Sequence, residues 1–194
     1  MRQGCFPVTR RGAVAILLLL SSISICSVES RAQVRSEYEV KAAFLYNFAK
    51  FVDWPPDAFP NGNSVLKICI LGQNPFGPEF GAFIEGKAAQ GRKLQFVQVR
   101  DVQQAKSCQI LYVASSEKPQ ILQILKAVDG ARVLTVGDWS EFARSGGIIN
   151  FVLENDRVRF EINVDAAERA GVKLSSKLLG VASIVRDKPG ATRN

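Results

Sequence analysis

Apolar residues return along this chain in two patterns, one with the period of a helix and one in short continuous runs. Residues 37–54 show the helical pattern, which places Val40, Phe44, Phe48 and Phe51 on one predicted face. Trp54 is followed by two prolines, which end the helix because proline lacks an amide proton and disfavours helical geometry just before it. A strongly apolar helix is therefore expected over residues 37–54.

The short apolar runs predict strands, and they alternate with further helical segments. The predicted strands are residues 66–71, 94–99, 110–114, 133–136, 148–153 and 158–164. The predicted helices between them are residues 76–84, 102–106, 117–128 and 139–144. Asn155 and Asp156 separate the last two strands, which are expected to form a hairpin.

The end of the chain predicts two more helices. Asp165, with Glu168 three residues later, resembles a capping box, and Gly171 is expected to end that helix. Ser175 is expected to cap a second helix that continues to Val185.

This alternation predicts an α/β fold. We expect a three-layer sandwich with a mostly parallel sheet flanked by helices, Rossmann-like but without a dinucleotide motif. In such folds ligands bind beyond the carboxyl ends of the strands. The predicted ligand crevice consists of Gln73, Asn74, Ser115, Ser116, Asp138 and Trp139.

The residues offer little support for catalysis. With no histidine, the chain cannot form a Ser-His-Asp or Cys-His triad or a histidine-bearing zinc site. Residues 72–77 lie where a phosphate loop would, but they lack the lysine and hydroxyl residue that such a loop needs. Asp138 with Glu141 is the best carboxylate pair, although Asp138 as a helix cap is the stronger interpretation. We predict a protein that is not an enzyme and uses no cofactor and no metal.

The first 32 residues have the order of a Sec-type signal peptide. Basic residues precede an apolar run of about 13 residues, shorter than a membrane span, and Ala32 offers a cleavage site. The predicted organisation is a signal peptide at 1–32, an α/β domain at 33–186 and a flexible tail at 187–194. An exported, periplasmic protein is therefore expected.

Removing the signal segment changes the charge and the cysteine count. The whole chain has 25 basic and 18 acidic residues, and losing four of the former and one of the latter lowers the net charge from +7 to +4. Dispersed charge of this size does not favour nucleic-acid binding. Cys69 and Cys108 remain, and in an oxidising compartment they favour a disulfide over two thiols.

The first helix carries a group of aromatic residues. Lys41, Asn47 and Lys50 are the polar positions there that we expect to face water. Core packing is the stronger interpretation of the aromatic group, but so apolar a helix also suggests a partner surface. The residues of that predicted partner surface are Phe44, Tyr46, Phe48, Phe51 and Trp54.

Several segments share their order with a known family. They include YEVKAAFLYNFAKFVDWP at 38–55, ILG at 70–72, NPFG at 74–77, CQILYV at 108–113, VLTVGD at 133–138, FEIN at 160–163 and SSKLL at 175–179. In this order they resemble the YfiR-like periplasmic family over residues 37–185.

The resemblance implies a non-catalytic periplasmic regulator. Such a protein represses an inner-membrane diguanylate cyclase by binding its periplasmic portion, and so acts in cyclic-di-GMP and biofilm signalling. An OmpA-like outer-membrane lipoprotein is a further implied partner, and a homodimer is also considered. Cys69 and Cys108 match the family's common disulfide positions. The alternative function is an exported small-molecule-binding sensory module that uses the strand-end crevice.

Overall fold

The computed structural model describes residues 26–59 and 65–187. The chain divides into two units, Met1–Ser36 and Glu37–Asn194, and the second contains the sheets described below. Most of the predicted signal peptide lies outside the described residues. Helix α2, Cys26–Phe51, begins earlier than predicted and runs through the predicted cleavage position at Ala32.

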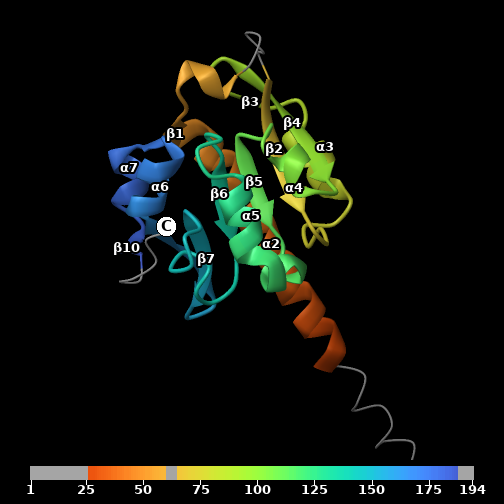
Figure 1. Cartoon of the computed structure of the whole chain (residues 1–194). Helices are drawn as coiled ribbons and strands as arrows, with labels where there is room; N and C mark the ends of the chain where they lie inside the picture. Colours follow the sequence, from red (N-terminus) through yellow and green to blue (C-terminus); the bar gives the residue numbers. More distant parts are fainter. Residues whose placement is uncertain (1–25, 60–64, 188–194) are drawn as a thin grey trace, which may run out of the picture. The chain divides into compact units, whose positions relative to one another are not determined.

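The second unit is built on an eight-stranded sheet in the order β10-β8-β7-β6-β5-β2-β4-β3 (Figure 1). Its strands are β2 (Val65–Leu71), β3 (Ala88–Ala89), β4 (Arg92–Val99), β5 (Ile110–Val113), β6 (Leu134–Gly137), β7 (Ile149–Glu154), β8 (Arg157–Asn163) and β10 (Ser183–Val185). The five central strands from β4 to β7 are parallel, whereas β8 pairs antiparallel with β7 as the predicted hairpin. The predicted mostly parallel sheet is confirmed.

Side chains alternate between the two faces of this sheet. In β2, Ile68 and Ile70 belong to the larger hydrophobic cluster, together with residues of α2 and of α3 (Glu79–Ile84). Cys69 and Leu71 belong to a second cluster, with residues of α4 (Val102–Ala105) and α5 (Ile121–Ala127). Because helices cover both faces, the α/β fold class is confirmed.

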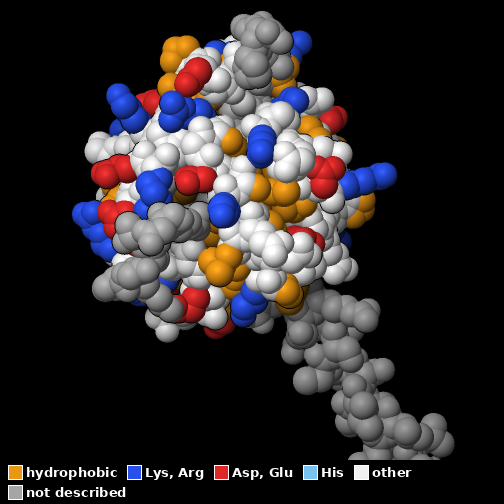
Figure 2. All heavy atoms as spheres, viewed as in Figure 1, with side chains coloured by type: hydrophobic (Ala, Val, Ile, Leu, Met, Phe, Trp, Pro, Cys, Tyr) orange, Lys and Arg blue, Asp and Glu red, His pale blue; other side chains and the backbone are white. Residues whose placement is uncertain are grey.

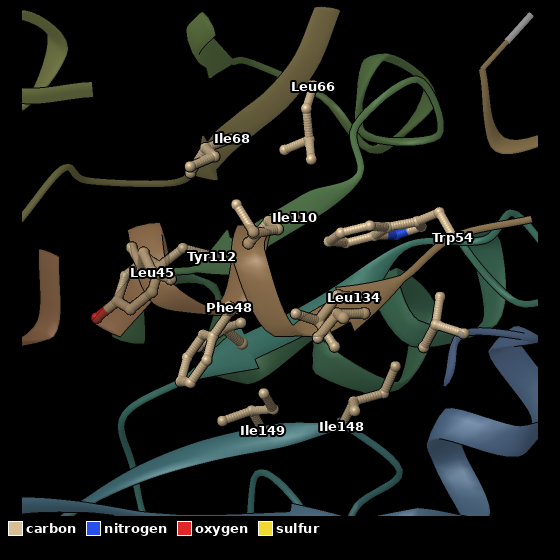
Figure 3. Close-up of a cluster of buried hydrophobic side chains, with 14 of the residues drawn as sticks. Leu45, Phe48, Trp54, Leu66, Ile68, Ile110, Tyr112, Leu134, Ile148 and Ile149 are labelled. Carbon is tan, nitrogen blue, oxygen red and sulfur yellow. The ribbon is translucent and has the colours of Figure 1, made fainter. Parts of the chain in front are cut away.

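Helix α2 supplies much of the larger cluster. Leu45 and Phe48 reach into it beside strand residues such as Ile110 and Ile149 (Figure 3). The Phe48 ring centroid lies 5.7 Å from that of Phe151 and 5.4 Å from that of Phe160. The helix is thereby anchored to the β7–β8 hairpin.

The buried face of α2 is rotated from the predicted one. Val40 was expected on that face, but it is 42% exposed. The buried positions are instead Ala42, Leu45, Phe48, Ala49 and Val52. Phe48 is on both the predicted and the observed face, whereas Phe44 and Phe51 are only partly buried, because small and aliphatic residues hold the other fully buried positions.

The predicted disulfide between Cys69 and Cys108 is present. Its Cα atoms are 6.0 Å apart, and it joins β2 to the residue that precedes Gln109 and β5. Both cysteines are buried in the second cluster. Closing a loop of this length stabilises the fold by about 4 kcal/mol in the chain-entropy model.

Residues 139–144 are turns and not the predicted helix. The Phe142 ring occupies the space where Gly137 and Gly147 have no side chain, since a Cβ at either would come within 2.6 Å of it. Contact with these glycines holds the segment against the sheet, and this packing outweighs local helical preference.

Two predictions for the end of the chain need correction. Asn163, not Asp165, caps α6 (Val164–Ala170), and its side chain accepts a hydrogen bond from the Ala166 amide. Helix α7 (Ser176–Leu179) is short, and the chain then forms β10 at the sheet edge instead of a longer helix. Asp187 accepts a hydrogen bond from Asn163 Nδ2 at 2.7 Å, and the rest of the predicted tail lies outside the described residues.

Other predictions for this region are confirmed. Gly171 ends α6 with a φ of 67°, and the Ser175 side chain caps α7. The smaller elements are η1 (Pro56–Ala58), η3 (Ser115–Gln120) and a two-stranded sheet of β1 (Val52–Asp53) and β9 (Lys173–Leu174). Within the described ranges, no helix has the length and apolar character of a membrane span.

Candidate functional site

A buried ionic cluster lies at the carboxyl end of β6. Asp138 directly follows this strand, and its Oδ2 accepts a hydrogen bond from Lys41 Nζ at 2.8 Å. The same oxygen accepts one from the Tyr38 hydroxyl at 2.9 Å. The side chains of Lys41 and Asp138 are only 6% and 5% exposed. The cluster therefore joins α2 to the end of a central strand.

Lys41 has two further neighbours. Its Nζ lies 2.5 Å from Glu37 Oε1, one helical turn earlier, at the i,i+4 spacing that favours such pairs. It also lies 4.3 Å from the centroid of the Tyr38 ring. The ammonium group is thus shared between two carboxylates and shielded by an aromatic ring.

Two tyrosines surround the Asp138 carboxylate. Burial, followed by the negative charge of Asp138, raises the pKa values of Tyr38 and Tyr112 well above the ordinary 10.0. The Tyr112 hydroxyl forms no hydrogen bond of normal geometry within the described part of the chain, but it lies close enough to Asp138 and Tyr38 for both to raise its pKa. Both phenols therefore stay neutral at physiological pH.

This arrangement fixes charges in place. A general acid or base needs a pKa near the working pH, and the pKa values of both tyrosines lie far above it. Lys41, for its part, is engaged by carboxylates on two sides. Removing Lys41 would leave the Asp138 charge buried without its cationic partner, which is strongly destabilising. The chemistry of the cluster is that of a clamp between helix and sheet.

The predicted ligand crevice is only partly assembled. The Ser116 hydroxyl accepts a hydrogen bond from the Gln73 amide at 3.0 Å, so these two residues are neighbours. Asn74 is used within its own turn, where Oδ1 accepts from the Phe76 amide and Nδ2 donates to the Gly77 carbonyl. Ser115 is exposed at the start of η3.

The other two predicted crevice residues have separate surroundings. Asp138 is buried in the ionic cluster, and the Trp139 ring contacts that of Phe142 edge-on at 4.8 Å. Glu141, the other member of the candidate carboxylate pair, is half exposed, and its Oε1 lies 3.9 Å from Arg144 Nε. The interpretation of Asp138 as a helix cap is wrong, because its carboxylate binds α2.

One small pocket lies away from this edge. It is lined by residues of α5, β6 and α6, among them Leu125, Thr135 and Arg169. Its volume is about 20 Å³, which holds roughly one water molecule. It therefore offers no room for a metabolite.

The aromatic residues of the predicted partner surface have different surroundings. Phe48 and Trp54 are buried in the core, so the structure does not present them to a partner. Phe44, Tyr46 and Phe51 are partly buried against the same cluster. On the face shown in Figure 2, basic and acidic side chains are interspersed.

Lys41 was expected to face water, and its part in the site was missed. A signal was present, since Lys41 shares a helical face with Leu45, Phe48 and Val52 at spacings of four, seven and eleven. A lysine in that register has to be buried, and therefore needs an acidic partner. Tyr38 and Tyr112 gave no comparable signal. Within the described residues, no cluster of three or more cysteines and acidic residues could hold a metal ion.

Two solved structures resemble this chain: the ABC domain in complex with L-Trp from Streptococcus pneumonia and a conserved domain protein from Vibrio cholerae. Both have a TM-score of 0.46, with 12% and 16% identity over 62% and 66% of this chain. The chain covers 55% and 56% of those structures. The family model described as YfiR/HmsC-like matches residues 38–183, and this chain belongs to that family.

Proposed function

We propose that this protein is a non-catalytic periplasmic regulator that represses an inner-membrane diguanylate cyclase by binding its periplasmic portion. The observation that carries this proposal is the family match over residues 38–183. The disulfide between Cys69 and Cys108 is in keeping with an oxidising compartment. The buried clamp of Lys41 and Asp138 holds charges in place, as suits a protein that works through a surface.

A deletion experiment tests the repressor function. Deleting the gene is expected to raise cellular cyclic-di-GMP and biofilm formation, because the cyclase would lose its inhibitor. The full-length gene should restore the low level. A matched gene lacking residues 1–32 should not, because its product would stay in the cytoplasm. Unchanged cyclic-di-GMP under biofilm-forming conditions would contradict the proposal.

Direct binding is tested with the native membrane fraction. The mature protein, carrying an affinity tag, should recover a diguanylate cyclase from solubilised inner membranes. An OmpA-like lipoprotein is the partner to seek in outer membranes. A cyclase that responds to the deletion but never binds the protein would require an indirect route of control.

A further inference from the structure

Two lysines approach the same tyrosine ring near the carboxyl end of α2. Lys50 Nζ lies 5.3 Å from the centroid of the Tyr46 ring, and Lys87 Nζ lies 5.9 Å from it. Within the described ranges, neither ammonium group is paired with a carboxylate. Two positive charges thus converge on one ring, and no acidic side chain in the described part of the chain forms an ion pair with either.

An exposed aromatic side chain extends this surface. Lys87 Nζ lies 4.0 Å from the centroid of the Phe83 ring, and Phe83 is 36% exposed. Lys87 Nζ also donates a hydrogen bond to the Phe83 carbonyl, which fixes the lysine over that ring. We call Tyr46, Lys50, Phe83 and Lys87 the Tyr46 patch.

The two segments that carry the lysines are held together by Gln90. Its Nε2 donates to the Ala49 carbonyl at 3.0 Å and to the Val52 carbonyl at 2.6 Å. Gln90 lies between β3 and β4, three residues after Lys87, while Ala49 and Val52 flank the end of α2. The patch is therefore preorganised, which lowers the entropic cost of binding.

These features point to an anionic partner. Carboxylates form strong charge-assisted hydrogen bonds with lysine, and a bound carboxylate would relieve the repulsion between the two ammonium groups. Tyrosine is enriched among the residues that dominate protein interfaces. We propose that the Tyr46 patch is the docking surface for an acidic segment of the regulated membrane protein, an inference that rests on the proposed function.

A membrane surface is the less suitable occupant. Each lysine near an anionic membrane raises affinity by roughly five-fold, so the two unpaired lysines of the patch would contribute only about thirty-fold. That is too little to hold a protein of this size on lipid. An acidic protein segment can use the same two charges together with the Tyr46 and Phe83 rings.

Charge reversal tests the patch in the full-length protein. The double variant Lys50→Glu/Lys87→Glu should bind the cyclase about ten-fold more weakly or worse, and should fail to lower cyclic-di-GMP in the deletion strain. Lys118→Glu/Lys126→Glu is the matched control, because these exposed lysines lie in η3 and α5, away from the patch. It should behave as the wild type does.

A second pair of variants separates charge from fold. Lys50→Arg/Lys87→Arg keeps both charges and should retain binding, whereas Lys50→Gln/Lys87→Gln removes them and should weaken it at an unchanged melting temperature. Wild-type binding by both the Gln and the Glu double variants would overturn the inference. The repressor function would still stand if the deletion raised cyclic-di-GMP.

Vesicles provide the remaining arm of the test. The wild-type protein should not sediment with vesicles of phosphatidylglycerol and phosphatidylcholine. Sedimentation that disappears in Lys50→Glu/Lys87→Glu, together with unaltered cyclase binding, would overturn the inference and assign the patch to the membrane.

Discussion

Lys41 and Lys50 lie nine residues apart on one helix, yet they carry their charges in opposite ways. Lys41 is buried, its Nζ lies 2.5 and 2.8 Å from carboxylate oxygens of Glu37 and Asp138, and it links α2 to the carboxyl end of the central strand β6. Lys50 is exposed in the last turn of the helix, close to aromatic rings and without a carboxylate partner in the described chain. The role of a lysine therefore depends on its neighbours. Lys41 stabilises the fold, whereas Lys50 is available to bind a partner.

The largest expected effect is the loss of the buried pair. Lys41→Met should lower the free energy of unfolding by about 3–5 kcal/mol, because the Asp138 charge stays buried without its partner. Lys50→Met is the control and should change it by less than about 0.5 kcal/mol. Urea denaturation of both variants measures the difference, and equal effects would remove the distinction between the two lysines.

The two tyrosines beside Asp138 are expected to contribute unequally to the stability of the buried region. Tyr38→Phe removes a hydrogen bond to a carboxylate and should cost about 1.5–3 kcal/mol of unfolding free energy. Tyr112→Phe removes a buried hydroxyl that lies close to Asp138 and Tyr38 but forms no hydrogen bond of normal geometry, so it should cost less than Tyr38→Phe, at most about 1 kcal/mol. Thermal or urea unfolding tests this order, which a larger loss in Tyr112→Phe would reverse.

The hydrogen bonds that Gln90 donates to the end of α2 can be tested by removing its side chain. Gln90→Ala should cost about 1–2 kcal/mol, because the carbonyls of Ala49 and Val52, two fully buried residues, lose a hydrogen-bond donor. Amide hydrogen exchange should then increase around residues 49–52 and stay unchanged around Lys41. Gln103→Ala, at an exposed position in α4, is the control. Equal exchange in both variants would show that Gln90 does not hold the end of α2.

The smallest expected effect concerns alkaline pH. The pKa of Tyr38 is raised in the folded state, so its contribution to stability is fully present below the unfolded value of about 10 and declines as the pH rises above it. Tyr38→Phe should therefore show a shallower loss of stability than the wild type above pH 10. Urea midpoints measured from pH 8 to 11 test this, and parallel curves would contradict it.

The strands could be predicted because burial on both faces leaves a direct mark on the sequence. Residues 110–114 contain only apolar side chains apart from the Tyr112 hydroxyl, and they became a central strand. The hairpin and the disulfide were likewise predictable from local residue types. The strands and the hairpin were marked by a few neighbouring residues, and the disulfide was indicated by two cysteines in a protein expected in an oxidising compartment.

The rest depended on contacts between distant segments. Residues 139–144 have helical spacing, but Phe142 packs where Gly137 and Gly147 leave room, and this contact determines the conformation. The site was hidden for the same reason, because Lys41 and Asp138 are 97 positions apart. Sequence spacing on α2 could place Lys41 on the buried face, but could not identify Asp138 as its partner.

The bond between Cys69 and Cys108 turns part of the chain into a covalent ring. The ring encloses α3, β3, β4 and α4, and therefore the outer strands at one side of the sheet. A protease that cuts once between these cysteines leaves both pieces attached. Such a nicked protein would migrate as two fragments only after reduction. It could also keep Lys87 and Gln90 beside α2, so a single proteolytic cut need not abolish the fold or its binding surface.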